Sequence, residues 1–237
     1  MAKKLTKIAI CTPVYNNVDF DVYINHLHCV SKWANSYDLI FLGTRGSALV
    51  ASCEHIAEHA IEKNCDYALF LDADHIMPVE TLDCLTQNAD EAAMISGLVC
   101  KKGDDHQQIW WVKDDTKELS YKYTDFALDG KRYEVDICAF GCTLINISKL
   151  KQLDKPWFKI TYEDKHNVGF DVNLCKAFRN ANEKIYVDSR VLVGHHGILE
   201  TIYPQSKNYF VAKQLLRSNR LKDNQSGFYS VVREGEN

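Results

Sequence analysis

The sequence lacks the features that mark secreted, membrane-spanning or broadly nucleic-acid-binding proteins. No apolar run approaches the length that a helix needs to cross a bilayer, and the apolar stretch 8–11 is too short for a signal peptide. Lysine and arginine total 28 against 32 acidic residues, so the formal net charge of −4 provides no overall basic field. We therefore expect a cytoplasmic protein without stable membrane insertion.

Cysteine pairs with the spacing of a zinc site are also absent. The chain has nine cysteines, an odd number, but no CxxC motif, and most of them lie inside apolar segments. Buried free thiols in a reducing compartment explain this pattern better than a disulfide framework does. We therefore expect the cysteines to be free.

Strand and helix patterns alternate over the first hundred residues. Short apolar runs at 7–12, 37–42, 67–71 and 92–98 predict strands, and a one-sided apolar pattern at 47–63 predicts a helix. Such alternation favours a mainly parallel sheet between layers of helices. The sequence therefore predicts an α/β fold.

The pattern changes in the second half of the chain. Residues 101–136 are polar and aromatic, which predicts hairpins and loops. An amphipathic helix is expected at about 171–182, strands at 184–188 and 191–194, and a last helix at about 205–221. The sequence contains no repeat, low-complexity tract or linker, so we expect one domain.

Two carboxylates one residue apart follow the predicted strand 67–71. Because Asp72 and Asp74 lie at positions i and i+2, an extended chain points both to the same side. In open α/β sheets, ligands bind at the carboxyl ends of strands. Like charges held close together favour a positive partner, and a divalent cation with oxygen ligands is the first candidate. A solvated turn in which Asp74 caps a short helix explains the same residues, and the pair alone does not decide.

Four motifs occur in the order found in one enzyme family. They are IAICTPVYN, YALFLDADHIMP, CAFGCTLINISKLKQLDKPWF and GFDVNLCKAFRNANEKIYVDSRVLVGHHG. Over most of its length the chain resembles the family 2-like GT-A fold glycosyltransferases of bacteria and their phages, with YALFLDADHIMP as the DxD motif. The resemblance implies a Rossmann-like, nucleotide-diphospho-sugar transferase fold with a mixed, mainly parallel central sheet. It implies one domain, 1–237, with a nucleotide-sugar-binding half at 1–100, an acceptor-binding half at 101–205, and a C-terminal helix and tail at 206–237.

The resemblance also implies roles for acids and histidines. Asp74 matches the motif aspartate that binds Mn²⁺ or Mg²⁺, and Asp72 matches the one that contacts the ribose or the metal. His195 matches a late histidine that completes the metal site, with His196 as second choice, and imidazole beside carboxylates suits Mn²⁺. Asp171 matches the catalytic acid that, in inverting members, accepts the proton of the acceptor hydroxyl.

One departure concerns the base. Phe170 stands where the family has a glutamate beside the catalytic aspartate, although Glu163 and Asp164 lie nearby in the sequence. Asp171 could also do no more than cap its helix. The base and the inverting outcome therefore stay open at this point.

A nucleotide pocket is expected at the carboxyl ends of the first three strands. Residues 52–54 lack the Arg-Asn pair of related phage enzymes, so Arg45 is expected to supply the basic group for the diphosphate. The residues that we expect to contact the nucleotide sugar are Thr12, Pro13, Tyr15, Arg45, Asp72 and Ala73.

The activity that the resemblance implies is metal-dependent transfer of a sugar from a nucleoside diphosphate sugar, with UDP-sugar favoured, to an acceptor hydroxyl, and inversion is the favoured of the two outcomes. The acceptor class stays open among a glycan, a protein side chain, a lipid-linked sugar and a hydroxymethylated DNA base of a phage. A nucleotidyltransferase would use the same sheet and metal site. However, the loop VYNNVDFD has neither the glycine nor the basic residue that such enzymes usually carry there. A binding module without turnover is the third alternative, because fold alone does not exclude it.

Overall fold

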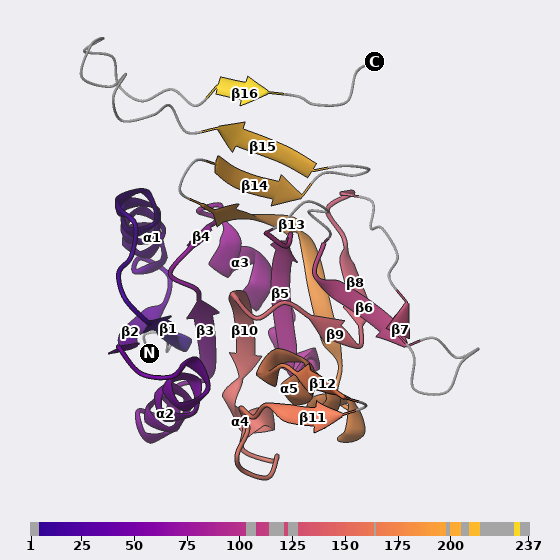
Figure 1. The fold of residues 1–237 in the computed structure, drawn as a ribbon. Coiled ribbons are helices and arrows are strands. Elements are labelled where there is room, and N and C mark those ends of the chain that lie inside the picture. Colours follow the sequence, from indigo (N-terminus) through magenta and orange to yellow (C-terminus); the bar gives the residue numbers. More distant parts are fainter. Residues whose placement is uncertain are drawn as a thin grey trace.

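The computed structural model describes residues 5–102, 108–113, 121–122, 128–163, 165–197, 200–204, 209–213 and 230–232. Figure 1 shows the arrangement of the elements. In chain order they are β1 (Lys7–Val14), α1 (Phe20–Trp33), β2 (Asp38–Arg45), α2 (Leu49–Glu62), β3 (Tyr67–Leu71), β4 (His75–Ile76), α3 (Thr81–Thr86), η1 (Ala89–Glu91), β5 (Met94–Val99), β6 (Trp110–Lys113), β7 (Tyr121–Lys122), β8 (Arg132–Val135), β9 (Ile137–Cys138), β10 (Cys142–Asn146), α4 (Ile147–Leu150), β11 (Thr161–Glu163), β12 (His166–Val168), α5 (Phe170–Asn180), β13 (Ile185–His196), β14 (Glu200–Pro204), β15 (Tyr209–Lys213) and β16 (Ser230–Val232).

One mixed sheet of 11 strands runs through the molecule in the order β16-β15-β14-β13-β5-β10-β3-β1-β2, with β4 and β8 each pairing with β13. Strand β1 is parallel to β2 and to β3, and β5 is parallel to β13. Strand β10 lies antiparallel between β3 and β5. The expected α/β fold around a mixed, mainly parallel central sheet is confirmed.

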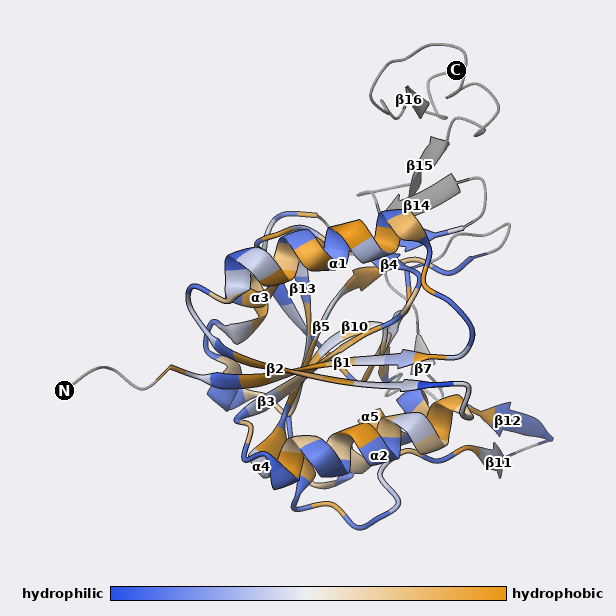
Figure 2. Cartoon of the chain, turned by 90° about the vertical axis from the view of Figure 1, so that its left-hand side faces the viewer, coloured by the Kyte–Doolittle hydropathy of each residue, from blue (hydrophilic) through white to orange (hydrophobic). Residues whose placement is uncertain are grey.

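Helices cover both faces of the sheet, with α1 and α3 on one face and α2, α4 and α5 on the other (Figure 2). Strand β3 is buried along its whole length, as predicted for an apolar run between two helix layers. Its side chains alternate, so that Ala68 and Phe70 pack in the core beneath α2 while Leu69 and Leu71 pack beneath α1 and α3. Because side chains alternate along β3 up to Leu71, this pattern also sets the direction in which the chain enters the turn with Asp72 and Asp74.

A single long strand, β13, replaces the two short strands expected at 184–188 and 191–194. Its pairing with β5 shifts register between Asp188 and Leu192, where a bulge takes up the polar residues between the two apolar runs. The Asp188 carboxylate is fully buried and lies 2.9 Å from Arg132 Nε and 2.6 Å from Arg190 Nη2. Both arginines also donate to the Cys84 carbonyl at the end of α3. The bulge is therefore fixed by charge as well as by pairing.

The helix expected at about 205–221 is wrong where the structure describes it. Residues 209–213 form β15, which pairs antiparallel with β14 in the register Val211 to Ile202. The aromatic and β-branched residues of this segment favour a strand once a neighbouring edge is present, and a helical period in one segment cannot reveal such an edge. The rest of the expected helix lies outside the described residues.

The nine cysteines are free, as expected, and all except Cys84 are buried. Burial raises the pKa of Cys29 to about 12, which keeps this thiol protonated and unreactive. Among the helices in the described part of the chain, none has the length and apolar character needed to span a bilayer.

We predict that Asp188→Ala lowers the free energy of unfolding by about 3–5 kcal/mol, because it leaves two partly buried arginines without their counter-charge. Urea denaturation followed by circular dichroism measures this change. Asp129→Ala is the matched control, because Asp129 pairs with the exposed Lys131 and its loss should change stability little. Equal effects of the two substitutions would contradict the role given to Asp188.

Candidate functional site

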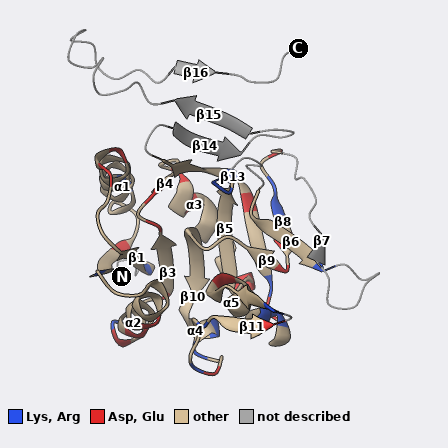
Figure 3. Cartoon of the chain, in the orientation of Figure 1, with Lys and Arg blue, Asp and Glu red and all other residues tan. Residues whose placement is uncertain are grey.

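Asp72 and Asp74 lie in the tight turn that joins β3 to β4, at the carboxyl end of β3. The Asp72 amide donates to the Gly141 carbonyl at 2.8 Å, which holds the turn against the residue before β10. Strand β4 then pairs antiparallel with β13, in a register that places His75 opposite His195. Acidic residues mark the segment that leads into β4 and the start of α5 (Figure 3). The topology thus brings two acids and two histidines to one edge of the sheet.

The Asp74 carboxylate is surrounded by nitrogen atoms. One oxygen lies 2.6 Å from Lys102 Nζ and 3.4 Å from His195 Nε2, and the other lies 3.8 Å from His75 Nδ1. Partial burial alone would raise the pKa of Asp74, but the His195, His75 and Lys102 side chains together lower it well below its usual range. Asp74 is therefore ionised at neutral pH.

His195 is oriented by a backbone hydrogen bond. Its Nδ1 lies 2.8 Å from the Cys100 carbonyl, which fixes the ring with Nδ1–H as the donor and Nε2 toward Asp74. A histidine that donates one ring nitrogen to a carbonyl and presents the other is the usual arrangement of a metal ligand. The predicted proximity of Asp74 and His195 is present in the structure.

Asp72 has the opposite electrostatic character. Its side chain is 34% exposed but lies deep at the strand end, and desolvation, together with the negative charge of Asp74, raises the pKa of Asp72 to about 6. Two acids in one turn thus differ widely in proton affinity. Asp74 carries the more stable negative charge, and Asp72 takes up a proton at a higher pH than Asp74 does.

His75 is the site residue that sequence reasoning missed. Its side chain is only 4% exposed, and its Nδ1 lies 3.7 Å from the nearer Asp72 oxygen. Neither ring nitrogen has a hydrogen-bond partner, although the nearby Gly141 backbone slightly favours the protonated form of the ring. Burial, followed by the nearby His195, lowers the pKa of His75 to about 3, so its imidazole is neutral. Its place directly after the two aspartates was the available signal.

Gly141 makes room for this arrangement. A Cβ atom at this position would lie 2.1 Å from Cε1 and 2.3 Å from Nδ1 of His75, and 2.6 Å from Oδ2 of Asp72. Real Cβ atoms do not approach other atoms so closely, so glycine is required if the His75 ring is to stay in place. The glycine in the motif CAFGCTLIN is therefore needed to leave space for the His75 ring.

Asp171 lies in the first turn of α5, after the N-cap Gly169. Its carboxylate folds back over Gly169, whose added Cβ would lie 2.4 Å from Asp171 Oδ1. Burial raises the pKa of Asp171, and hydrogen bonds from the backbone at Val172 and Asp171 itself oppose this only in part. The amide end of a helix favours the charged form of an acid, but at Asp171 desolvation outweighs that effect. Asp171 also adds to the negative field at Asp72.

The other acids near the missing glutamate do not join this group. Glu163 is exposed on the hairpin β11–β12, where it pairs with Lys176 at 2.8 Å. Asp164 lies outside the described residues. Phe170, at the position where the resemblance implies a glutamate, has its ring centroid 5.1 Å from that of Phe140 and packs against the core beneath α5.

A cavity of about 610 Å³ lies at the carboxyl ends of β1 and β2. Thr12 and Arg45 line it, as do Asn16 and Asn17 in the loop that leads to α1. Arg45 Nε donates to the Asn16 carbonyl at 3.1 Å, and Arg45 Nη2 donates to Asn17 Oδ1 at 3.3 Å. Two of the expected nucleotide contacts, Thr12 and Arg45, therefore line one cavity.

The remaining expected nucleotide contacts lie elsewhere. Pro13 is buried in the sheet, Tyr15 is 70% exposed, and neither lines this cavity. Ala73 is half-buried between the two aspartates.

His196 points away from His195, as alternation along β13 requires. Its Nε2 lies 3.4 Å from the Asp19 carboxylate, and with Asp21 these residues form a second acid–histidine group at the start of α1. The His196 amide donates to the Asp74 carbonyl at 2.7 Å. The turn at residues 72–74, with Asp72 and Asp74, is called the acid turn below. The loop before α1 reaches from the cavity, which Asn17 lines, to this acid turn, beside which Asp19 contacts His196.

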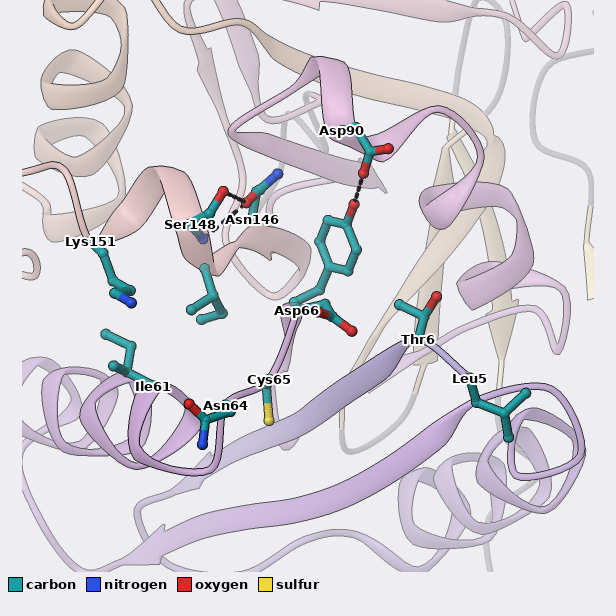
Figure 4. A pocket seen from close by; sticks show the side chains of 12 residues that line it. Leu5, Thr6, Ile61, Asn64, Cys65, Asp66, Asp90, Asn146, Ser148 and Lys151 are labelled. Carbon is teal, nitrogen blue, oxygen red and sulfur yellow. Dashed lines mark hydrogen bonds between the residues drawn. The ribbon is translucent and has the colours of Figure 1, made fainter. Parts of the chain in front are cut away.

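A second cavity, of about 520 Å³, lies at the opposite edge of the sheet, around the start of β3 (Figure 4). In it the Tyr67 hydroxyl donates to Asp90, and Asn146 caps α4 by accepting from the Ser148 amide. Tyr67 and Asn146 therefore have structural roles there. The acid–histidine group at the carboxyl ends is the stronger candidate site.

No protein-family model matches this sequence, and no curated protein matches it. Similar solved structures exist. A197 from STIV is 18% identical, with a TM-score of 0.60 over 88% of this chain and 94% of that chain, which establishes a shared fold.

Two further structures are less similar. S. aureus TarS 1–349, in complex with UDP-GlcNAc, is 17% identical, with a TM-score of 0.40 over 77% of this chain and 56% of that chain. A glycosyltransferase involved in the glycosylation of the major capsid of PBCV-1 is 11% identical, with a TM-score of 0.31 over 63% of this chain and 68% of that chain.

We predict that Gly141→Ala lowers the free energy of unfolding by about 1–3 kcal/mol, because the added methyl overlaps the His75 ring. The same substitution should cost less than half as much in a His75→Ala background, where the ring is gone. Chemical denaturation of the four proteins of this double-mutant cycle measures the difference. An unchanged cost in the second background would refute the contact.

Proposed function

We propose that this chain is a glycosyltransferase of the GT-A type that transfers a sugar from a nucleoside diphosphate sugar to an acceptor hydroxyl. The observation that carries the proposal is the convergence of Asp72, Asp74, His195 and Asp171 at the carboxyl edge of the sheet. A cavity with a guanidinium group lies along the same edge. This is the place where open α/β sheets bind ligands. The order of the four sequence motifs is a second, independent support.

The acid turn has the donor chemistry of a divalent cation site. Asp74 is ionised, and His195 presents Nε2 toward it from a ring held by the Cys100 carbonyl. Carboxylate with imidazole suits Mn²⁺ and, less well, Mg²⁺. Such a cation, when bound, supplies positive charge for the diphosphate as it leaves. Asp72, in the same turn, would contact the ribose or the cation.

The donor's nucleotide fits the cavity beside β1 and β2. Thr12 offers a hydroxyl and Asn17 a side-chain amide, and Arg45 offers a planar guanidinium that can hydrogen-bond oxygen atoms or stack on a base. A ligand in this cavity would have its phosphates directed along the loop toward the acid turn. UDP-sugars are the donors we favour.

Asp171 is the group best suited to accept the acceptor's proton. In the proposed step the acceptor oxygen bonds to the anomeric carbon as the bond from that carbon to the diphosphate oxygen breaks. The hydroxyl proton passes to the Asp171 carboxylate, and the pair of electrons leaves on the diphosphate. The raised pKa of Asp171 makes it a stronger base than a solvated aspartate. Attack opposite the leaving group gives inversion.

We predict that Asp74→Asn weakens Mn²⁺-dependent binding of UDP by at least about tenfold, because the charged ligand of the cation is lost. Isothermal titration calorimetry with and without Mn²⁺ measures this. Asp129→Asn serves as control, because Asp129 pairs with Lys131 and belongs to neither acid–histidine group. Unchanged Mn²⁺-dependent affinity in Asp74→Asn would exclude the assignment.

We predict that Asp171→Asn lowers kcat by about 10²-fold or more while donor affinity barely changes, because the substitution removes the base and keeps the shape. The donor is found first by a hydrolysis screen of UDP-, GDP-, TDP- and CMP-sugars with Mn²⁺. Glu163→Gln is the matched control, since Glu163 is an exposed acid paired with Lys176 and should turn over normally. Normal turnover of Asp171→Asn, or a product that retains the donor's anomeric configuration, would contradict the base role.

A further inference from the structure

His75 has no role in the reaction described so far, yet it is held in an unusual place. It is a buried imidazole whose ring nitrogens make no hydrogen bond, and Nδ1 faces two carboxylates at 3.7 and 3.8 Å. Buried polar groups nearly always have partners, so an exception indicates a missing ligand or a function. Both carboxylates are too distant for direct hydrogen bonds, and the space between them and Nδ1 lies inside the acid turn.

The His75 ring cannot easily turn away from the acids. The β4–β13 ladder fixes its backbone, and its carbonyl is 3.0 Å from Nε2 of His26 on α1. Gly141 approaches so closely that a single added carbon would overlap Nδ1. The ring of His195 stands 4.5 Å away, centroid to centroid. The position of Nδ1 is thus set by three neighbouring segments of chain.

The chemistry of this position is that of a metal ligand. An imidazole nitrogen is a common metal ligand, and Nδ1 of His75 faces the carboxylates of Asp72 and Asp74. Ligand atoms of Asp74, His75 and His195 lie within 4.8 Å of one another. This group differs from an ordinary solvent-exposed acid cluster, because it includes a buried imidazole nitrogen without a hydrogen-bond partner.

We propose that His75 is the third protein ligand of the cation, through Nδ1, beside Asp74 and His195, and that Asp72 lies outside the direct ligand set. The proposal deepens the proposed function and rests on it for the cation's use in transfer. Two imidazoles and one carboxylate bind Mn²⁺, Co²⁺ or Zn²⁺ in preference to Mg²⁺. The site would therefore discriminate against Mg²⁺ more strongly than a site made of carboxylates alone.

Lys102 neutralises the Asp74 carboxylate with its ammonium, as a bound cation would. Its ammonium lies 2.6 Å from Asp74, and both side chains are about half-exposed, so the pair can open without disturbing the core. An entering cation must displace this ammonium from Asp74. Removing Lys102 should therefore strengthen cation binding, whereas removing His75 should weaken it.

The test uses the full chain and Mn²⁺ alone, with no donor. Calorimetry should show that His75→Gln weakens Mn²⁺ binding about tenfold or more. Lys102→Met should tighten it by about two- to fivefold, the scale of a half-exposed ion pair. His28→Gln, an exposed histidine on α1, should leave the affinity unchanged. Mn²⁺ should also bind the wild-type protein at least tenfold more tightly than Mg²⁺ does.

Pulsed electron paramagnetic resonance of the Mn²⁺-loaded wild-type protein provides a readout that needs no variant. Couplings from two imidazole nitrogens are expected, and one of them should disappear in His75→Gln. A single nitrogen in the wild-type spectrum, or equal Mn²⁺ affinity of His75→Gln and wild type, would overturn the proposal. These measurements involve no sugar transfer. A two-nitrogen Mn²⁺ site in a protein that hydrolyses no nucleotide sugar would overturn the proposed function and leave the ligand set standing.

Discussion

The short ladder between β4 and β13 is the constraint on which the rest of the site depends. Two residues of β4 pair with β13, and this register alone sets His75 opposite His195. The turn before β4 has only three residues, so the pairing also determines where Asp72 and Asp74 can lie. Backbone hydrogen bonds between β4 and β13 therefore bring together side chains that are far apart in the sequence.

The charged bulge in β13 supports this ladder from a distance. Because the register shifts between Asp188 and Leu192, the last residues of β13 are carried past the end of β5 to reach β4. Asp188 and its two arginines tie the bulge to the carbonyl end of α3, where orphan carbonyls need donors. The buried Asp188 carboxylate, which lies outside the candidate site, thus helps to position residues of that site.

The sequence alone predicted the parts of the molecule that depend on local pattern. The strand 67–71 and the proximity of Asp74 to His195 are present as expected, since apolar runs and ordered motifs report them directly. His75 was missed because its importance arises from burial and from Gly141, which lies 66 positions away in the sequence but in contact in space. The strand at 209–213 was missed because it depends on pairing with β14, which periodicity within one segment does not encode.

The buried free thiols can report local opening of the structure, because they react only when they become exposed. Cys53 and Cys175 lie in the core beneath α2 and α5, whereas Cys29 and Cys142 lie in the core beneath α1 and α3. A thiol-specific reagent can reach any of them only after the layer above it has moved. The opening rates of the helix layers on the two faces of the sheet can therefore be measured separately from the labelling rates of these cysteines, without an added probe.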